Sequence, residues 1–208
     1  MEMMTIKEFK DKSNIEIIQE LIKVNRGYIT SKQLTELGIH RGYLKIMVDR
    51  GIIEKVTSGV YIDKNVIEDA FFTFQLRYPK TVYSGFTALY FYNLTEVYPS
   101  EYDITVPSNY HVDNINKNHN VIKCKSENFD IGITKVKTSL GYEVNVYDRE
   151  RCICDLIRFR NKFDLEQVKK SVKMYVNDKN KDINKLREYS IKLNVYNDVM
   201  GIVGMYYE

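Results

Sequence analysis

In the first third of the chain, the apolar positions change from a helical period to a strand period. Thr30, followed three residues later by Gln33, forms a capping box that predicts the start of a helix, and Gly38 is suited to end it. A second helix is predicted over about residues 40–50. Apolar residues around a turn at residues 57–59 then predict a short hairpin. The order of helix, turn, helix and hairpin is that of a winged helix-turn-helix.

The second of these helices has one apolar and one polar face. At about 100° per residue, the apolar side chains cluster on one side, where we expect the core: Tyr43, Leu44, Met47 and Val48. Gly42, Lys45 and Asp49 lie opposite, with Arg41 at the edge of that face and His40 at the N-terminal end, where recognition helices present side chains to base edges. Arginine can bind guanine through two donors, and lysine can bind phosphate. The residues predicted to contact DNA are Ser31, Lys32, His40, Arg41, Gly42, Lys45 and Lys55. The alternative is that this motif only packs against a partner protein or against the rest of the chain.

The charge balance limits how tightly such a domain can bind. Residues 1–65 hold 11 Lys and Arg against 9 Asp and Glu, and the remainder holds 20 against 19. DNA affinity grows with the number of phosphates that are neutralised, so one nearly balanced domain should bind weakly. We therefore expect promoter DNA with repeated half-sites, occupied by more than one copy.

The rest of the chain predicts a second, larger domain. A support helix is predicted over about residues 14–25, and the 208 residues divide into a winged domain, 1–65, and a C-terminal α+β domain, 66–208. Further helices are predicted over 66–78, 82–93, 149–160, 165–176, 183–193 and 196–206, and strands over 103–107, 121–125, 131–138 and 142–148. Residues 108–120, which include His111 and His119, form a long polar loop. The fold class is α+β: an N-terminal winged helix-turn-helix followed by a mixed α/β domain that ends in a helical bundle.

The helix predicted over residues 149–160 carries a row of charges. Arg151, Asp155 and Arg158 recur at helical spacing on its polar side, and Arg160 and Lys162 extend the row. Two interpretations remain open. Such a row is usually a solvated, salt-bridged face, and it is otherwise a basic docking surface.

The residues indicate no catalytic or metal-binding constellation. Glycine-rich phosphate loops and the common hydrolase motifs are absent, and the three cysteines lack the spacing of a zinc site. Ser84 and Gly85, followed by Asp103, faintly match the layout of a nucleotidyltransferase, but Thr105 stands where a second acidic metal ligand is needed. We expect no cofactor, no metal and no enzymatic activity.

The same composition bears on location. The first twelve residues lack the apolar stretch of a secretion signal, and no segment approaches the roughly 18 continuous apolar residues that span a membrane. Few cysteines, odd in number, indicate a reduced intracellular protein. We expect a soluble, cytoplasmic chain with no membrane partner.

Three segments together resemble the antitoxins of the abortive-infection type IV toxin-antitoxin systems, the AbiEi family. They are ITSKQLTELGIHRGYLKIMVDRGIIEKVTSGVYI, VYSGFTALYFYNLTEVYPSEYDITVP and VYDRERCICDLIRFRNKFD with the helices that follow. The first is shared by many repressors, whereas the other two are more particular to this family.

The resemblance implies two activities on one chain. The winged domain would repress its own operon at promoter repeats, and the C-terminal domain would counteract a cognate nucleotidyltransferase-like toxin, with no stable complex required. For the second activity the predicted surface consists of Arg151, Arg158, Arg160 and Lys162. The alternative is a ligand-responsive winged-helix regulator, in which a run of tyrosines lines a pocket: Tyr83, Tyr90, Tyr92, Tyr98 and Tyr102. An apolar cavity would favour the regulator, and a filled core with a basic outer face would favour the antitoxin.

Overall fold

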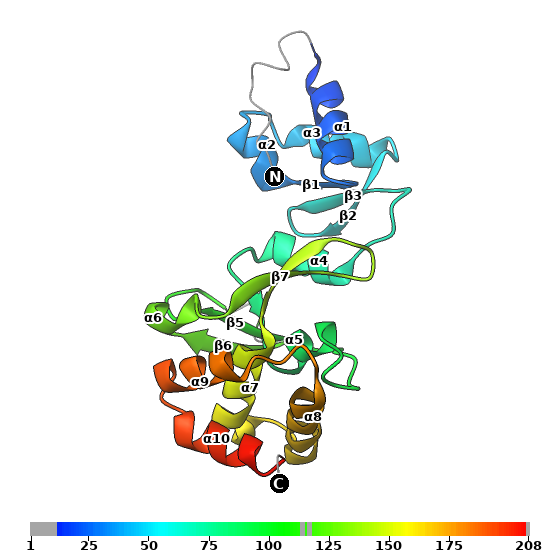
Figure 1. Ribbon diagram of the computed structural model, residues 1–208. Coiled ribbons are helices and arrows are strands. Elements are labelled where there is room, and N and C mark those ends of the chain that lie inside the picture. The colour runs from blue at the N-terminus through cyan, green and yellow to red at the C-terminus, as the bar shows by residue number, and fades with distance from the viewer. Residues whose placement is uncertain (1–11, 113–114, 116–117, 207–208) are drawn as a thin grey trace. The chain divides into compact units, whose positions relative to one another are not determined.

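The chain folds into two compact units, each with its own sheet and helices. A computed structural model describes residues 12–112, 115 and 118–206, so part of the predicted polar loop and the first eleven residues lie outside the described residues. The units are Met1–Pro79 and Lys80–Glu208. The mixed α and β composition, the winged first unit and the helical C-terminus confirm the predicted fold class (Figure 1).

The first unit is a winged helix-turn-helix. Its sheet has the order β1-β3-β2, with antiparallel pairing throughout, and β2 and β3 form the wing. The strand β1, which precedes the helix-turn-helix, was not predicted. The elements are α1 (Asn14–Val24), β1 (Tyr28–Thr30), α2 (Ser31–Glu36), α3 (Gly42–Asp49), β2 (Ile53–Thr57), β3 (Val60–Asp63) and α4 (Ala70–Arg77).

Local signals in the sequence explain where these helices begin and end. Thr30 Oγ1 accepts a hydrogen bond from Gln33 N at 3.2 Å, and Thr30 N donates to Gln33 Oε1 at 2.8 Å, which confirms the capping box. Gly38 has φ of +69°, a left-handed conformation that glycine adopts at little cost, and it ends α2. Behind the helices lies one apolar core: Ile18, Ile22, Ile29, Leu34, Ile39, Leu44, Met47 and Ile53.

The helix α4 groups with the first unit, beyond the boundary predicted after residue 65. The Tyr28 hydroxyl accepts a hydrogen bond from Asp69 N at 2.7 Å, and the Phe72 ring meets the Tyr28 ring edge-on at 5.1 Å. These contacts join residues more than forty positions apart, and they hold the start of α4 against β1. The division into compact units therefore falls at Pro79.

The second unit is built on a five-stranded mixed sheet with the order β6-β5-β4-β8-β7. The pairs β5–β6 and β4–β8 are parallel and the others antiparallel. The four predicted strands and the four predicted C-terminal helices are present, whereas β4 and α6 were not predicted. The elements are β4 (Val82–Tyr83), α5 (Gly85–Phe91), β5 (Asp103–Pro107), β6 (Asn120–Cys124), α6 (Ser126–Phe129), β7 (Ile133–Lys137), β8 (Glu143–Tyr147), α7 (Arg149–Arg158), the 3₁₀ helix η2 (Arg160–Lys162), α8 (Leu165–Asn177), α9 (Ile183–Lys192) and α10 (Tyr196–Gly204).

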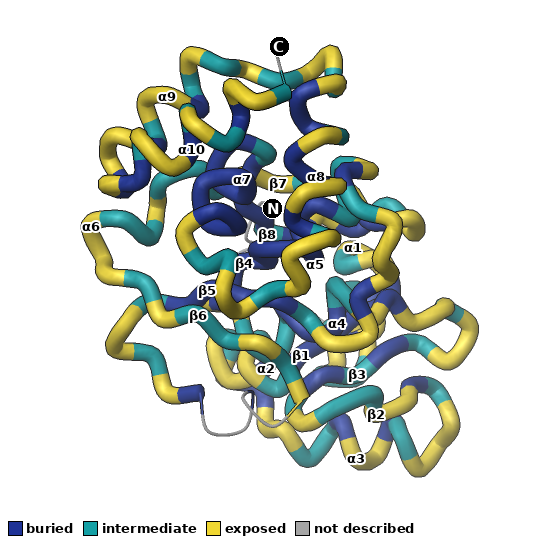
Figure 2. Tube along the Cα trace, turned by 90° about the horizontal axis from the view of Figure 1, so that it is seen from below, coloured by how far each residue is buried: buried dark blue, intermediate teal, exposed yellow. Residues whose placement is uncertain are grey.

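Helix α7 is the centre of the second unit. It packs against α5, α8, α9 and α10, and its residues from Glu150 to Ile157 are all buried. Figure 2 shows its trace almost entirely in the colour of buried residues. Over these residues the helix therefore has neither the solvated face nor the docking surface that were the two interpretations of its charge spacing.

Candidate nucleic-acid interface

Helix α3 presents an exposed row of polar side chains away from the core of the first unit. Leu44 and Met47 are buried on its inner face, as predicted, whereas Lys45 and Asp49 are exposed on its outer face. The helix begins at Gly42, two residues later than predicted. His40 lies just before it, where its Nδ1 accepts a hydrogen bond from Gly42 N at 3.1 Å.

The predicted base contact Arg41 is held in place by the preceding helix. Arg41 Nε donates to Thr35 Oγ1 at 2.8 Å, and the Thr35 hydroxyl donates in turn to Ser31 O at 2.9 Å. Because both partners belong to α2, the guanidinium is oriented before any ligand arrives. Fixing an arginine in advance lowers the conformational entropy that binding costs. Thr35 was missed in the sequence, since the bond joins residues that no helical spacing brings together.

The N-terminus of α2 lies beside the tip of the wing. Ser31 N donates to the carbonyl oxygen of Gly59, in the wing turn, at 2.9 Å. Lys55 is exposed on β2, and Lys32 is exposed on α2, where its Nζ lies 3.6 Å from Glu36 Oε1. The structure thus joins the N-terminus of α2 to Arg41 and to the wing turn.

Of the four residues predicted for an antitoxin surface, Arg151 is in the core and the prediction for it was wrong. Its side chain is 2% exposed. Its guanidinium donates to Asp155 Oδ2 at 2.8 Å and to the carbonyl oxygens of Asn128 at 2.7 Å and Ile131 at 2.9 Å, and it lies over the Tyr147 ring at 4.2 Å. Asp155, predicted on the same polar side of the helix, is 3% exposed. Burial raises the pKa of the Asp155 carboxyl, and the adjacent Arg151 opposes that rise.

The other three cations gather where α7 ends, and we call Arg158, Arg160 and Lys162 the basic end of α7. Arg158 and Lys162 both lie over the Phe159 ring, at 5.3 and 5.4 Å, and both are exposed. Arg160 donates to Ile157 O at 2.9 Å and lies 3.8 Å from Asp198 Oδ1. The basic end of α7 is therefore a small accessible patch, in contrast to Arg151.

The residues that faintly matched a nucleotidyltransferase do meet in space. Asp103 Oδ2 accepts a hydrogen bond from Phe86 N at 2.8 Å, and Asp103 Oδ1 accepts one from Asn120 at 3.0 Å. Gly85 has φ of +50°, and a Cβ there would lie 2.8 Å from Asp103 Oδ2. Burial raises the pKa of Asp103, and these hydrogen bonds partly offset the rise. Its carboxylate is thus engaged in holding the start of α5 against β5.

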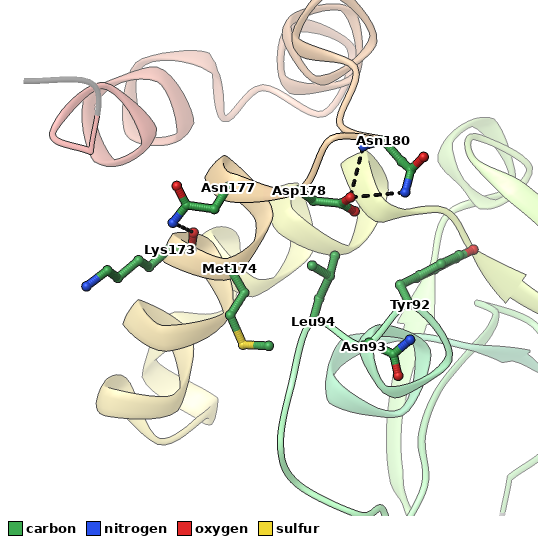
Figure 3. Close-up of a pocket in the computed structure, with 8 residues that line it drawn as sticks. All are labelled: Tyr92, Asn93, Leu94, Lys173, Met174, Asn177, Asp178 and Asn180. Atoms are coloured by element: carbon green, nitrogen blue, oxygen red, sulfur yellow. Dashed lines mark hydrogen bonds between the residues drawn. The ribbon is translucent and has the colours of Figure 1, made fainter.

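The five tyrosines of the alternative hypothesis do not surround a common cavity. Tyr83 packs against Tyr102 at 5.3 Å, Tyr90 packs against Tyr98 at 5.5 Å, and Tyr102 stacks on His119. Tyr98 and Tyr92 line separate open hollows. The hollow at Tyr92, of about 530 Å³, is also lined by Asn93, Leu94, Lys173, Met174, Asn177, Asp178 and Asn180 (Figure 3). Most of those other side chains are polar. This hollow is not the enclosed apolar cavity that would favour a ligand-responsive regulator.

Within the described ranges, no group of three or more His, Cys, Asp and Glu side chains is placed to hold a metal ion. His111 is exposed, and His119 Nδ1 accepts a hydrogen bond from Tyr102 N at 3.1 Å. Burial raises the pKa of the Cys154 thiol to about 12, and it raises the pKa of Cys152 as well. No helix in this part of the chain has the length and apolar character to cross a bilayer.

Comparisons with known proteins agree with this architecture. Over its whole fold, the chain is similar to the crystal structure of the RV2827C protein from Mycobacterium tuberculosis, with a TM-score of 0.62 and 12% identity, covering 92% of this chain and 76% of that one. A search of curated proteins gives no match. Residues 16–62, from α1 through the wing, match the family model described as "Transcriptional regulator, AbiEi antitoxin". The match confirms the resemblance of the winged segment to the AbiEi antitoxins that the sequence predicted.

Proposed function

We propose that the chain is a type IV antitoxin that represses its own operon and counteracts a nucleotidyltransferase-like toxin in phage abortive infection. The observation that carries the first half is the exposed outer face of α3, with Arg41 fixed by Thr35, inside a domain that matches an antitoxin transcriptional regulator. The chain acts in the cytoplasm and has no enzymatic activity of its own.

The winged unit binds double-stranded promoter DNA through α3. Arg41 and Lys45 contact bases or phosphates in the major groove, and His40 and Gly42 lie at the helix start, where the backbone comes nearest the DNA. Lys55 on the wing contacts the phosphate backbone, and the N-terminus of α2 adds Ser31 and Lys32. Because the unit carries little net charge, tight binding requires repeated half-sites.

Toxin neutralisation rests on the second unit. Its basic end of α7 offers three cationic groups, two of which, Arg158 and Lys162, lie over the Phe159 ring. Such a patch attracts nucleic acid or an acidic protein surface. Arg151 contributes indirectly, because it holds α7 in place.

Growth rescue tests both halves in the intact chain. Cells that express the toxin of the same operon would also receive wild-type chain, an Arg41→Ala/Lys45→Ala variant, or a variant with alanine at all three positions of the basic end of α7. We expect the first variant to protect the cells while losing repression of a promoter reporter, and the second to repress while losing protection.

A matched control removes three other exposed lysines of the second unit, Lys123, Lys125 and Lys137. It should retain protection, because the total charge changes equally but the basic end of α7 is intact. Full protection by the variant that lacks the basic end would refute this choice of surface.

A further inference from the structure

The outer face of α3 holds an apolar residue that the polar contacts do not explain. Ile46 is 41% exposed and lies four residues after Gly42 and three before Asp49, in the same outward row as Lys45. Residues at these spacings share one side of a helix. A ligand that reaches Lys45 through the major groove would therefore meet Ile46 beside it.

Packing within the first unit does not account for an isoleucine at this position. The apolar cluster behind α3 includes Leu44 and Met47, with Tyr43 and Val48 at its margin, and Ile46 is not part of it. A β-branched side chain is also less favourable in a helix than lysine, glutamine or glutamate, which are usual at exposed positions. In the free protein, Ile46 is therefore less favourable than a polar residue, because its apolar side chain is exposed to water and its helix propensity is lower.

The surroundings of Ile46 specify the kind of surface that would cover it. Gly42, one turn earlier, has no side chain to keep a ligand away from the helix, and the oriented Arg41 and the exposed Lys45 supply positive charge on the same side. In the major groove of B-DNA, the one apolar group that a base pair presents is the 5-methyl of thymine. An exposed isoleucine with cations on either side is complementary to a thymine methyl group, because the isoleucine can contact the methyl while the cations contact the neighbouring phosphates.

We propose that Ile46 is a specificity-determining residue that contacts a thymine 5-methyl group in each half-site, an inference that rests on the DNA-binding function proposed above. Arg41 and Lys45 then supply affinity and base contacts, whereas Ile46 distinguishes thymine from cytosine at one position. The contact buries a single methyl group on the DNA side. Removing that methyl should weaken binding by about fourfold per half-site.

Deoxyuridine substitution tests this contact atom by atom, because deoxyuridine differs from thymidine in DNA only by lacking the methyl group. Nuclease footprinting with wild-type protein first defines a protected promoter segment. A duplex of that segment is then made with each thymidine of a half-site replaced singly by deoxyuridine, and the Kd is measured for the wild type, Ile46→Ala and Ile46→Leu. We expect one position at which deoxyuridine lowers the affinity of the wild type and of Ile46→Leu by about fourfold but leaves the affinity of Ile46→Ala unchanged.

The matched control is Ile67→Ala, which removes an isoleucine that is 75% exposed in the same unit but outside α3. This variant should keep the wild-type response at every thymidine. A footprint whose deoxyuridine responses are the same in wild type and Ile46→Ala would overturn the role of Ile46 and leave DNA binding intact. Absence of any protected segment would overturn both proposals.

Discussion

Arg151 provides the sharpest test of how the second unit is held together. Its guanidinium bonds to Asp155 and to the carbonyl oxygens of Asn128 and Ile131, and the side chain is 2% exposed. An Arg151→Met change keeps much of the volume and removes the charge. It leaves the buried Asp155 carboxylate without its cation, which typically costs about 3 to 5 kcal/mol.

Urea unfolding followed by far-ultraviolet circular dichroism measures this loss. With an m-value of about 2 kcal/mol per molar, the midpoint of the second unit should fall by about 1.5 to 2.5 M. Adding Asp155→Leu should recover part of the loss, because removing both charges of a buried pair is far less costly than removing one. The double variant should remain less stable than the wild type, because the carbonyl oxygens of Asn128 and Ile131 are left without a hydrogen-bond donor.

The pH dependence of the single variant gives a second check. Burial raises the pKa of Asp155, and without Arg151 only the weaker effect of the Arg158 charge still opposes that rise. A raised carboxyl pKa means that the folded state holds its proton longer than the unfolded state, so stability decreases as pH rises above about 3.9, the pKa of an unperturbed aspartate. The deficit of Arg151→Met should therefore be smaller at pH 5 than at pH 8. A deficit below about 1 kcal/mol at pH 8 would refute the account of Arg151 as a core residue that holds α7.

Three further predictions concern the winged unit and one partly buried histidine of the second unit. Arg41→Ala with Lys45→Ala should leave the thermal midpoint nearly unchanged and reduce the slope of log K against log salt by about 2 in salt titrations, since two cations near phosphates are lost; an unchanged slope would count against the recognition-helix assignment. Leu44→Ala, at a position 1% exposed, should destabilise the winged unit by about 2 to 5 kcal/mol in urea unfolding, and a change below about 1 kcal/mol would contradict the core placement. Burial lowers the pKa of His119 below its ordinary value of 6.5, so the neutral histidine contributes its full stability above pH 6.5 and this contribution is lost as the pH falls through the folded-state pKa. His119→Gln should therefore flatten the pH dependence of unfolding free energy below pH 6.5. An unchanged pH dependence would exclude His119 as its source.

The first unit was predictable from sequence because its signals are local. The capping box of Thr30 and Gln33, the left-handed Gly38 and the wing turn each act within a few residues. The strand β1 was missed because three residues are too few to show a period of two, and all three are buried. The grouping of α4 with this unit depends on a hydrogen bond between Tyr28 and Asp69, which no local pattern reveals.

The second unit shows where periodicity misleads. Helical spacing placed Arg151, Asp155 and Arg158 on one side of α7, and both interpretations of the row, a solvated face and a basic docking surface, assumed that this side is exposed. In the structure, the neighbouring helices and the β6–β7 connection cover most of that side, and Arg151 and Asp155 satisfy each other inside the core. Only at the end of the helix, at Arg158, does the row become exposed. Opposite charges one helical turn apart are therefore compatible with both environments, because Arg151 and Asp155 are buried whereas Lys32 and Glu36 are exposed.

We propose that the winged unit gives the chain sequence-specific DNA binding at its own promoter. The most direct measurement is a fluorescence anisotropy titration of a labelled promoter duplex and a shuffled duplex of equal length, with wild-type chain and with the Arg41→Ala/Lys45→Ala variant, at several salt concentrations. We expect the wild type to prefer the promoter by about a thousandfold or more, and the variant to lose this preference while remaining folded. Equal affinity of the wild type for both duplexes, or an undiminished preference in the variant, would contradict it.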